Sequence, residues 1–369
     1  MKILFLCGSL EPGKDGVGDY TRRLAAALIR KGHEAQIIAL CDKHSKTYVA
    51  QQQEIEKTLV PVYRIPQKTT YRERFKLSQG LVDDLQPNWV SLQYVPYSFH
   101  PKGLPFWLPR FLKKLKGNHQ WHIMFHEVLT PGSNFFSKII RLTQILLTKK
   151  MSNITRVSLI NTSITPYSEL LYKLGINSRI LPLFSNIPIS NSFSNHKINS
   201  EIITIGLFSK FKLNDPIRNT LMEIFSLVKK EGFKLKFLLI GGSIIDCNNF
   251  EHFCRLNYID KLEVEKTGFL NEEEVSLKIR ECDIGLSPVK SSILGKSGSA
   301  LAFVEHGVKL VLPFINQKQT IDEDFFKHNI YSKIDSKLFL KYNNNKQRID
   351  LLSKCSLNFL NQLNEFHEN

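Results

Sequence analysis

The sequence predicts an α/β protein made of two doubly wound parallel-sheet domains. Short apolar runs alternate with stretches of helical periodicity through most of the chain. The alternation stops once, at an Asn- and Ser-rich linker over 186–200, and then restarts. The 369 residues are also enough for two domains of ordinary size. Ligands of open parallel sheets bind beyond the carboxyl ends of the strands, so we expect the two domains to face each other across a cleft.

Six apolar runs in the first half predict strands that are buried on both faces of a parallel sheet. A helix is expected at 19–31, because apolar residues recur on one of its faces and Gly32 follows as a stop. The expected strands are 2–7, 35–40, 89–95, 121–127, 155–161 and 178–184.

The second half repeats this pattern after the linker. Helices are expected at 217–230 and 271–282, the second with Asn271 as its N-cap and three Glu in its first turn. The expected strands are 202–208, 235–240, 262–266, 284–289 and 309–313. We therefore expect a first domain at 1–187, a second at 188–345, and a C-terminal helix within 346–369 that packs back on the first domain.

The charge is unevenly distributed along the chain. Residues 1–190 carry 26 Lys and Arg against 12 Asp and Glu, whereas residues 191–369 carry 24 against 22. A basic first domain indicates an anionic partner, and membrane phospholipid, a pyrophosphate-linked acceptor and nucleic acid all fit; a solubilising surface is the alternative. The sequence contains no recognisable nucleic-acid module, so we expect no nucleic-acid partner.

We expect the protein to be cytoplasmic. Only five apolar residues lie between Lys2 and Gly8, too few for a signal-peptide core, and no apolar run approaches the ~20 residues that span a bilayer. The stretch 104–116 interleaves aromatic and basic residues, which favours either peripheral binding to the inner face of an anionic membrane or an ordinary helix packed on the sheet.

No metal site is expected. The six cysteines form no CxxC pair, and no Cys/His cluster has zinc spacing, so buried reduced thiols are expected. The acidic triplet at 322–324 lies in a polar stretch past the last predicted strand, and we interpret it as a solvated face.

Two strand ends of the first domain carry candidate site residues. The strand at 2–7 leads into a glycine-rich loop that ends in Gly16 and Gly18, where the free N–H groups of a helix start can bind an anion; a plain turn is the alternative. The strand at 121–127 ends in His126 and Glu127. The imidazole could donate a hydrogen bond to a ligand hydroxyl or stabilise charge, although a lone histidine is also common in a protein core.

Two strand ends of the second domain also carry candidates. Lys210 and Lys212 follow the strand at 202–208, where they could clamp a diphosphate or lie in solvent. Gly241 and Gly242 follow the next strand, and their turn could line a nucleotide pocket or serve only to reverse the chain.

The most informative segment is LGKSGSALAFVEHG at 294–307. A helix is expected to start near Gly298 and to stop at Gly307, and its first N–H groups can bind a phosphate. Glu305 lies on the same helix, and a carboxylate there suits a pair of ribose hydroxyls. The candidate phosphate-binding residues are Ser297, Gly298, Ser299 and Ala300.

Taken in order, these segments resemble the GT-B glycosyltransferases of the retaining family 4 type, which have two Rossmann-like domains. The resemblance implies transfer of a sugar, with retention of anomeric configuration, from a nucleotide diphosphate, UDP or GDP, to a glycan or lipid-linked acceptor, without a metal ion or other cofactor. It covers nearly the whole chain and is carried by KILFLCGSLEPGKDGVGDYTRRLAAALIRKGHEAQIIA, VSLQYVPYSFHPKGLP, IMFHEV, GLFSKFK, FLLIGG, TGFLNEEEV, CDIGLSPV and SGSALAFVEHGVKLVLP.

The resemblance also implies roles for single residues. Gly16 and Gly18 would approach the donor phosphates, and His126 would lie by the transferred sugar. Lys212 would bind the diphosphate, and Glu305 would hold the ribose. Further donor contacts are expected from Lys210, Gly241, Gly242 and 297–300, and acceptor contacts from Asp19, Tyr94 and Glu127.

The chain departs from the family pattern at two positions. Ser297 stands where the family has the first Glu of a pair, and Leu207 stands where an Arg normally follows the strand glycine; Lys210 could replace that charge. Loss of the Glu removes a contact expected near the donor sugar. Two functions are therefore open: an active transferase of polysaccharide or glycolipid assembly, and a GT-B protein that binds nucleotide sugar with little or no transferase activity.

Overall fold

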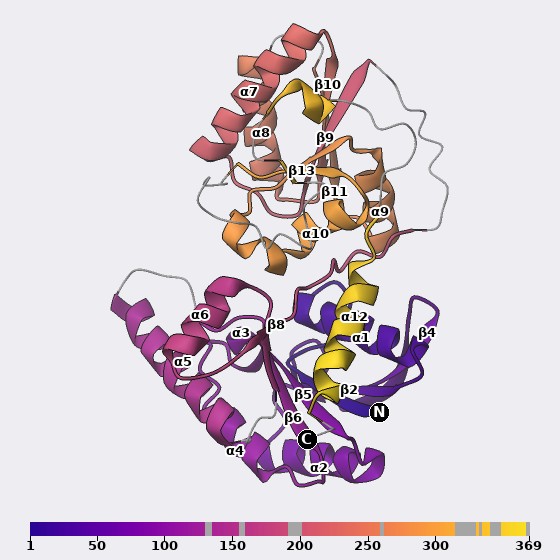
Figure 1. Cartoon of the computed structure of the whole chain (residues 1–369), viewed down its shortest axis with the longest axis vertical. Helices are drawn as coiled ribbons and strands as arrows, with labels where there is room; N and C mark the ends of the chain where they lie inside the picture. The colour runs from indigo at the N-terminus through magenta and orange to yellow at the C-terminus, as the bar shows by residue number, and fades with distance from the viewer. Residues whose placement is uncertain are drawn as a thin grey trace. The chain divides into compact units, whose positions relative to one another are not determined.

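The computed structural model describes residues 1–129, 135–154, 159–190, 201–258, 262–313, 330–331, 334–339 and 348–366. The chain divides into two compact units (Figure 1). The first unit contains Met1–Leu183 and Leu352–Asn369, and the second contains Phe184–Leu351. Most of the linker expected at 186–200 and the acidic triplet at 322–324 lie outside the described residues.

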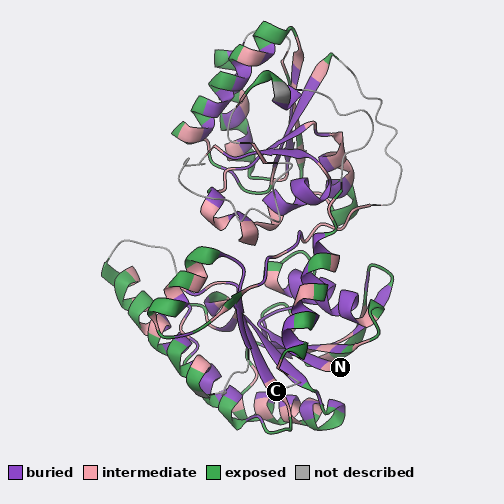
Figure 2. Ribbon diagram, viewed as in Figure 1, coloured by how far each residue is buried: buried purple, intermediate pink, exposed green. Residues whose placement is uncertain are grey.

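The first unit is built on an eight-stranded sheet in the order β3-β4-β2-β1-β5-β6-β7-β8. All neighbours pair in parallel except β3 and β4, which form an antiparallel hairpin at one edge. This pairing confirms the predicted parallel sheet. Its strands β1, β5 and β6 are buried along nearly their whole length, as their apolar runs indicate (Figure 2). The strands are β1 (Lys2–Cys7), β2 (Glu34–Asp42), β3 (Val49–Ile55), β4 (Thr58–Pro66), β5 (Trp89–Tyr94), β6 (Gln120–Phe125), β7 (Leu159–Thr162) and β8 (Arg179–Ile180).

Helices follow the strands of this unit. The first helix begins at Gly16, and the stop predicted at Gly32 is confirmed, because Gly32 has a φ of +83° just after the helix. The β3–β4 hairpin was not predicted, because β3 is polar and largely exposed at the sheet edge and so has no apolar run. The helices are α1 (Gly16–Arg30), α2 (Tyr71–Leu85), α3 (Pro96–Phe99), α4 (Trp107–Lys114), α5 (Phe135–Ile154), α6 (Thr165–Lys173) and α12 (Leu351–Asn364).

The second unit has a six-stranded parallel sheet in the order β11-β10-β9-β12-β13-β14. The N-cap predicted at Asn271 is confirmed: its side chain accepts from the Glu274 N–H, and Glu274 reaches back in a capping box. The elements are β9 (Ile202–Phe208), α7 (Asp215–Glu231), β10 (Lys234–Ile240), α8 (Ile244–Asn257), β11 (Leu262–Gly268), α9 (Glu272–Glu281), β12 (Ile284–Leu286), η1 (Ser291–Lys296), α10 (Gly298–Glu305), β13 (Lys309–Val311), β14 (Ile330–Tyr331) and η2 (Ser336–Phe339).

Helix α10 packs unusually close to its sheet because two strand residues have no side chain. Gly206 of β9 and Gly285 of β12 are paired across the sheet, and Phe303 of α10 covers both. A Cβ on Gly285 would lie 2.5 Å from the Phe303 ring, and one on Gly206 would lie 2.4 Å from the Cys282 Sγ. The two glycines therefore hold α10, and with it the loop that precedes it, against the middle of the sheet.

The C-terminal helix α12 belongs to the first unit. Phe359 is fully buried, and its ring stacks on Phe5 of β1 at a centroid distance of 6.1 Å and meets His122 of β6 at 5.1 Å. Gln362 forms a hydrogen bond with Asn161 of β7. Helix α12 therefore covers strands β1, β6 and β7 with both apolar and polar contacts.

The aromatic and basic stretch at 104–116 forms α4, which is a core helix. Phe111, Leu112 and Leu115 are buried, and Phe106 is the only apolar side chain of this stretch that is largely exposed. The second of the two interpretations, an ordinary helix packed on the sheet, therefore describes this stretch. No helix in the described ranges combines the length and the hydropathy needed to cross a bilayer.

Candidate functional site

The sheet of the second unit has one position where the strand order reverses. The chain runs from β9 outward through β10 to β11, and then returns to place β12 on the other side of β9. In open parallel sheets the loops leave in opposite directions at this point, and the crevice between them is the usual ligand site. The segments that follow β9, β10 and β12 carry the predicted donor residues.

The loop after β9 is anchored so that its two lysines stay exposed. Ser209 adopts a φ of +73°, and its N–H donates to the Ile240 carbonyl at 2.9 Å. Phe211 is buried against the Phe250 ring at a centroid distance of 5.6 Å. Lys210 and Lys212 flank Phe211, and neither forms an ion pair with another residue in the described part of the chain. A non-glycine residue with positive φ is strained, and such strain is common at binding sites.

The turn after β10 lies directly beside this loop. Gly241 and Gly242 have φ values of +71° and +81°, which only glycine adopts readily. A Cβ on Gly242 would come within 3.3 Å of the Phe211 ring and 3.4 Å of the Ser209 carbonyl oxygen. The glycines thus let two strand ends approach each other at the same edge of the sheet.

The helix start predicted in 294–307 is confirmed, because α10 begins at Gly298. Ser297 is its N-cap, with its Oγ accepting from the Ala300 N–H at 3.3 Å. The N–H groups of Gly298 and Ser299 donate to no other residue among those described. The residue at 297 is therefore used to cap the helix, and two backbone donors remain for an anion.

Glu305 lies at the opposite end of α10 and is only 3% exposed. A rise of ~1.5 Å per residue separates it from Gly298 by roughly 10 Å along the helix axis. The next residue, His306, was not singled out from the sequence. Its Nδ1 donates to the Ala302 carbonyl, and its Nε2 lies 2.8 Å from the Ser276 Oγ of α9, within hydrogen-bond distance. Ser190 also donates its N–H to Ser276, so this histidine ties α9, α10 and the start of the linker together.

In the first unit, the glycine-rich loop is closed by acidic residues of the chain itself. Asp15 caps α1 and accepts from the N–H groups of Val17 and Gly18 at 3.1 and 3.0 Å. Gly18 also has a packing reason, because a Cβ there would lie 2.4 Å from the Ser9 carbonyl oxygen. Gly16 is the first residue of the helix. A phosphate at this helix start would meet the Asp15 carboxylate, which already occupies the donors.

Asp19 is also engaged within the loop. It accepts from the Gly13 N–H at 3.1 Å and pairs with Arg22. Burial raises the pKa of Asp19, although the charge of Arg22 opposes the shift. This carboxylate therefore orders the loop.

A buried ion pair fixes the same loop from β2 and β4. Asp42, at the end of β2, is fully buried and accepts from Arg64 at 2.7 Å and from the Leu10 N–H at 3.1 Å. Arg64 also pairs with Glu11 at 2.5 Å. Burial alone would raise the pKa of Asp42, but the hydrogen bond from Arg64 and those from the His44 and Leu10 N–H groups outweigh it and lower the pKa. The loop after β1 is thus held by charge-assisted bonds.

His126 lies just beyond β6 and is the first member of a buried hydrogen-bond chain. Its Nε2 is 2.9 Å from the Gln93 Oε1, and Gln93 donates from its Nε2 to the Ser91 Oγ at 2.7 Å. Ser91 is 2.7 Å from the His122 Nδ1. The ring of Tyr20 meets His126 edge-on at 4.9 Å.

The buried series of hydrogen bonds continues from His122 to the C-terminal helix α12. The His122 Nε2 is 3.0 Å from the Asn161 Oδ1. Asn161 donates from its Nδ2 to the Arg179 carbonyl at 3.1 Å and to the Gln362 Oε1 at 2.7 Å. Gln362 in turn donates to the Ile180 carbonyl at 3.3 Å. The strand ends of β5, β6 and β7 are thereby connected to α12.

The backbone carbonyls at the far end decide the direction of every bond. A carbonyl only accepts, so Asn161 must turn its Nδ2 to Arg179 and its Oδ1 to His122, which then carries its hydrogen on Nε2. By the same logic Ser91 donates to His122, and His126 donates from Nε2 to Gln93. Burial lowers the pKa of both histidines to about 3, so both are neutral near pH 7.

This geometry corrects one expectation about His126. The N–H of the neutral ring is already used on Gln93, so the imidazole does not have a free donor for a ligand hydroxyl. Its Nδ1 remains as an acceptor. Sequence reasoning located His126 but missed Gln93, Asn161 and Gln362, which have no local pattern that marks them.

The other predicted acceptor residues behave differently. Tyr94 is fully buried, with its ring packed on Phe99 and Phe125, so its side chain is part of the core and is not available to an acceptor. Burial raises the pKa of this phenol. Glu127 is partly exposed next to His126 at the carboxyl end of β6.

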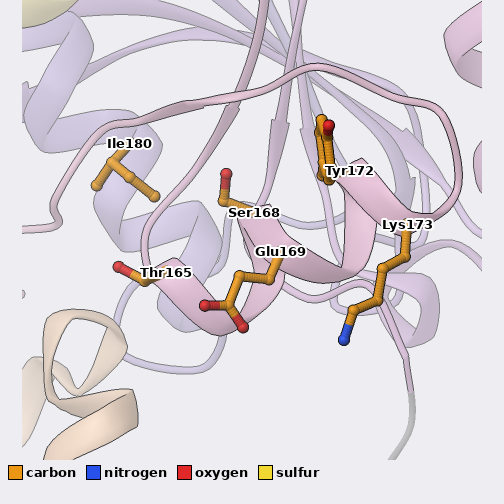
Figure 3. Close-up of a pocket in the computed structure, with 6 residues that line it drawn as sticks. All are labelled: Thr165, Ser168, Glu169, Tyr172, Lys173 and Ile180. Carbon is orange, nitrogen blue, oxygen red and sulfur yellow. The ribbon is translucent and has the colours of Figure 1, made fainter. Parts of the chain in front are cut away.

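A surface pocket of about 430 Å³ lies on α6 (Figure 3). Five of its lining residues share one face of α6, and the sixth, Ile180, comes from β8. None of the residues predicted from the sequence lines it. The α6 residues are Thr165, Ser168, Glu169, Tyr172 and Lys173.

Comparisons with known proteins give the fold. No protein-family model and no curated protein matches the chain. Among solved structures, a lipopolysaccharide outer core galactosyltransferase matches with a TM-score of 0.57 and 12% identity over 99% of both chains. A UDP-GlcNAc 2-epimerase from Methanocaldococcus jannaschii matches with a TM-score of 0.56 and 12% identity over 99% of this chain and 100% of that one. A sucrose-phosphate synthase from Thermosynechococcus elongatus matches with a TM-score of 0.56 and 12% identity over 85% of this chain and 81% of that one. The chain therefore has the α/β fold of two Rossmann-like domains that GT-B glycosyltransferases share with UDP-GlcNAc 2-epimerases.

Proposed function

We propose that the protein is a glycosyltransferase that binds a nucleotide-diphosphate sugar at the second unit and transfers the sugar, with retention, to a glycan or lipid-linked acceptor. The observation that carries the proposal is the grouping of three segments at the strand-order reversal of one sheet. These are the lysine loop after β9, the Gly241-Gly242 turn after β10, and the start of α10 after β12. The solved structures with this fold include transferases, which supports the same assignment.

The groups at this edge suit the charge that develops in the reaction. Departure of the nucleotide places negative charge on a diphosphate, while the sugar becomes oxocarbenium-like. Lys210 and Lys212 offer two exposed cations, and the N–H groups of Gly298 and Ser299 offer aligned donors at a helix start. Glu305 is the candidate ribose ligand, at the buried end of the same helix. The scheme requires no metal ion.

The first unit is proposed to take the acceptor. Its carboxyl sheet edge carries Glu127 as a partly exposed carboxylate beside His126. His126 would contribute through its neutral ring and its Nδ1 acceptor rather than through a charge. The ordered loop at Gly16 and Gly18 would form the other side of this surface.

A second candidate function, nucleotide-sugar binding with little transfer, is favoured by two residues. The Ser297 side chain caps α10, so no group at this position replaces the carboxylate that the family has there. Leu207 is fully buried and supplies no cation. Conversion of the donor without an acceptor is a third outcome, since a UDP-GlcNAc 2-epimerase shares the fold.

Thermal-shift measurements with UDP-, GDP-, ADP- and CMP-sugars test donor binding first. A ligand at 100 times its Kd should stabilise the folded state by about 2.7 kcal/mol, and no shift with any nucleotide would refute the proposal. Product analysis of the donor that binds, with and without acceptors, then separates transfer, hydrolysis and epimerisation from binding alone.

The variant Lys212→Ala tests the proposed chemistry. Loss of one electrostatic stabiliser should lower the transfer rate roughly tenfold to a thousandfold. The matched control is Lys230→Ala, which removes an exposed lysine from the end of α7 and should leave the rate unchanged. An undiminished turnover number in Lys212→Ala would remove this residue from the scheme.

A further inference from the structure

Helix α5 carries a row of large apolar side chains that the fold leaves uncovered. Figure 2 shows the outer side of this helix as largely exposed. The exposed fractions of these side chains lie between 47% and 74%. We call this row the α5 stripe; it consists of Phe135, Phe136, Ile139, Leu142 and Leu146.

The α5 stripe lies on one side of the helix, and the fold uses the other side. Successive residues are ~100° apart around the helix axis, so Phe135, Ile139, Leu142 and Leu146 fall within roughly 60° of each other. Phe136 lies next to them, a further ~60° around the axis. The opposite face is buried in the first unit through Gln144, Leu147, Thr148 and Met151. The stripe is therefore directed away from the body of its unit and is not needed for the core.

Positive charge borders the stripe. The sequence of α5 contains four basic residues and no Asp or Glu. Lys138 and Lys149 lie along one border of the stripe and Lys150 along the other, and all three are exposed. Helix α4 packs on α5 and adds exposed basic residues, Arg110, Lys113 and Lys114. An apolar face with cationic borders is the arrangement that binds to anionic lipid headgroups while the apolar side chains enter the acyl boundary.

We propose that the α5 stripe docks the protein on the surface of an anionic lipid bilayer. The charges favour this occupant over a second copy of the chain, because two α5 faces would bring like charges together. The first half of the sequence, with 26 basic and 12 acidic residues, is drawn to the same surface. The proposal does not rest on the proposed transferase activity, because binding to a bilayer is measured without donor or acceptor.

Vesicle flotation tests the proposal with three variants of the full chain. Leu142→Ser/Leu146→Ser removes the middle of the stripe, and Lys138→Gln/Lys149→Gln removes one charged border. The matched control, Ile244→Ser/Ile245→Ser, removes two side chains that are 80% and 72% exposed in the second unit. Each protein is mixed with vesicles of phosphatidylcholine alone or with phosphatidylglycerol added, at low and at high ionic strength.

The wild-type protein and the control should bind the anionic vesicles, more weakly at high ionic strength, and bind neutral vesicles poorly. The lysine variant should bind roughly 25-fold more weakly, at about fivefold per charge. The leucine variant should lose at least roughly tenfold. Absence of wild-type binding to anionic vesicles, or equal binding by the leucine variant, would overturn the proposal.

Two further measurements separate the other occupants. Light scattering without lipid should give the same molecular mass for the wild type and the leucine variant. If the wild type self-associates and the leucine variant does not, the stripe binds a second copy of the chain, and the proposal is overturned. An environment-sensitive dye on Leu146→Cys should shift to the blue with anionic vesicles and stay unchanged with an acidic peptide. A shift with the peptide alone would also contradict bilayer docking.

Discussion

Replacing Asn161 with Ala tests the buried hydrogen-bond chain at its branching point. The Asn161 amide is fully buried and bonds to the His122 ring at 3.0 Å, the Arg179 carbonyl at 3.1 Å and the Gln362 amide at 2.7 Å. Alanine removes all three bonds and leaves their partners in place. Arg179 lies at the surface and its carbonyl can bond to water, but the groups on His122 and Gln362 stay buried.

The expected cost follows from those two buried partners. An unpaired buried donor or acceptor costs about 1–3 kcal/mol, so Asn161→Ala should lower the free energy of unfolding of the first unit by roughly 2–6 kcal/mol, with some relief if water enters. Gln362→Ala should cost less, because it orphans one amide group of Asn161. The double variant should lose less free energy of unfolding than the sum of the losses in the two single variants, because each substitution removes an amide that the other leaves without a partner.

Urea unfolding followed by tryptophan fluorescence measures this unit alone. The three tryptophans, Trp89, Trp107 and Trp121, all belong to the first unit. Asn118→Ala is the matched control, because this exposed asparagine precedes β6 and should change stability by less than about 0.5 kcal/mol. An Asn161→Ala protein as stable as the control would refute the chain of bonds and the ring orientation deduced from it.

Two other predictions follow from the same structure. Because His122 and His126 have pKa values of about 3 in the folded state and about 6.5 when unfolded, the unfolded chain binds protons first as the pH falls. Their contribution is complete above about pH 6.5 and is lost towards pH 3, by up to roughly 1.4 kcal/mol per pH unit for each histidine. His126→Gln should therefore reduce the pH slope of the fluorescence-detected stability, and an unchanged slope would contradict neutral burial. In the second unit, Gly285→Ala should cost about 1–3 kcal/mol by overpacking against Phe303, seen as faster amide exchange in α10. Adding Phe303→Leu to Gly285→Ala should restore part of this loss. The control Gly80→Ala, in open space on α2, should be neutral or slightly stabilising. If amide exchange of α10 in Gly285→Ala is as slow as in the wild type, α10 does not pack as described.

Local patterns predicted the parallel strands and several helix ends. Buried strands such as β1 and β6 are continuous apolar runs, and Gly32 and Asn271 mark helix ends by their backbone and capping chemistry. The same reasoning missed the β3–β4 hairpin, because β3 lies at a sheet edge, where exposure removes the apolar pattern. It also located the lysine loop and the start of α10, since strand ends in a parallel sheet meet at one edge.

Tertiary structure decided which of these groups remain available to a ligand. From the sequence alone, His126 was a candidate donor to a ligand hydroxyl; its bond to Gln93, in a chain that ends at Gln362 of α12, uses that donor. Tyr94 was expected to contact the acceptor, but its side chain is fully buried in the core. The stretch 104–116 was open to membrane contact or to packing on the sheet, and its apolar side chains are mostly buried, whereas the exposed apolar row lies on α5. Short-range sequence patterns determine which element forms, but burial and hydrogen bonding depend on neighbours far away in the chain, such as Asn161 and its partner 201 residues later.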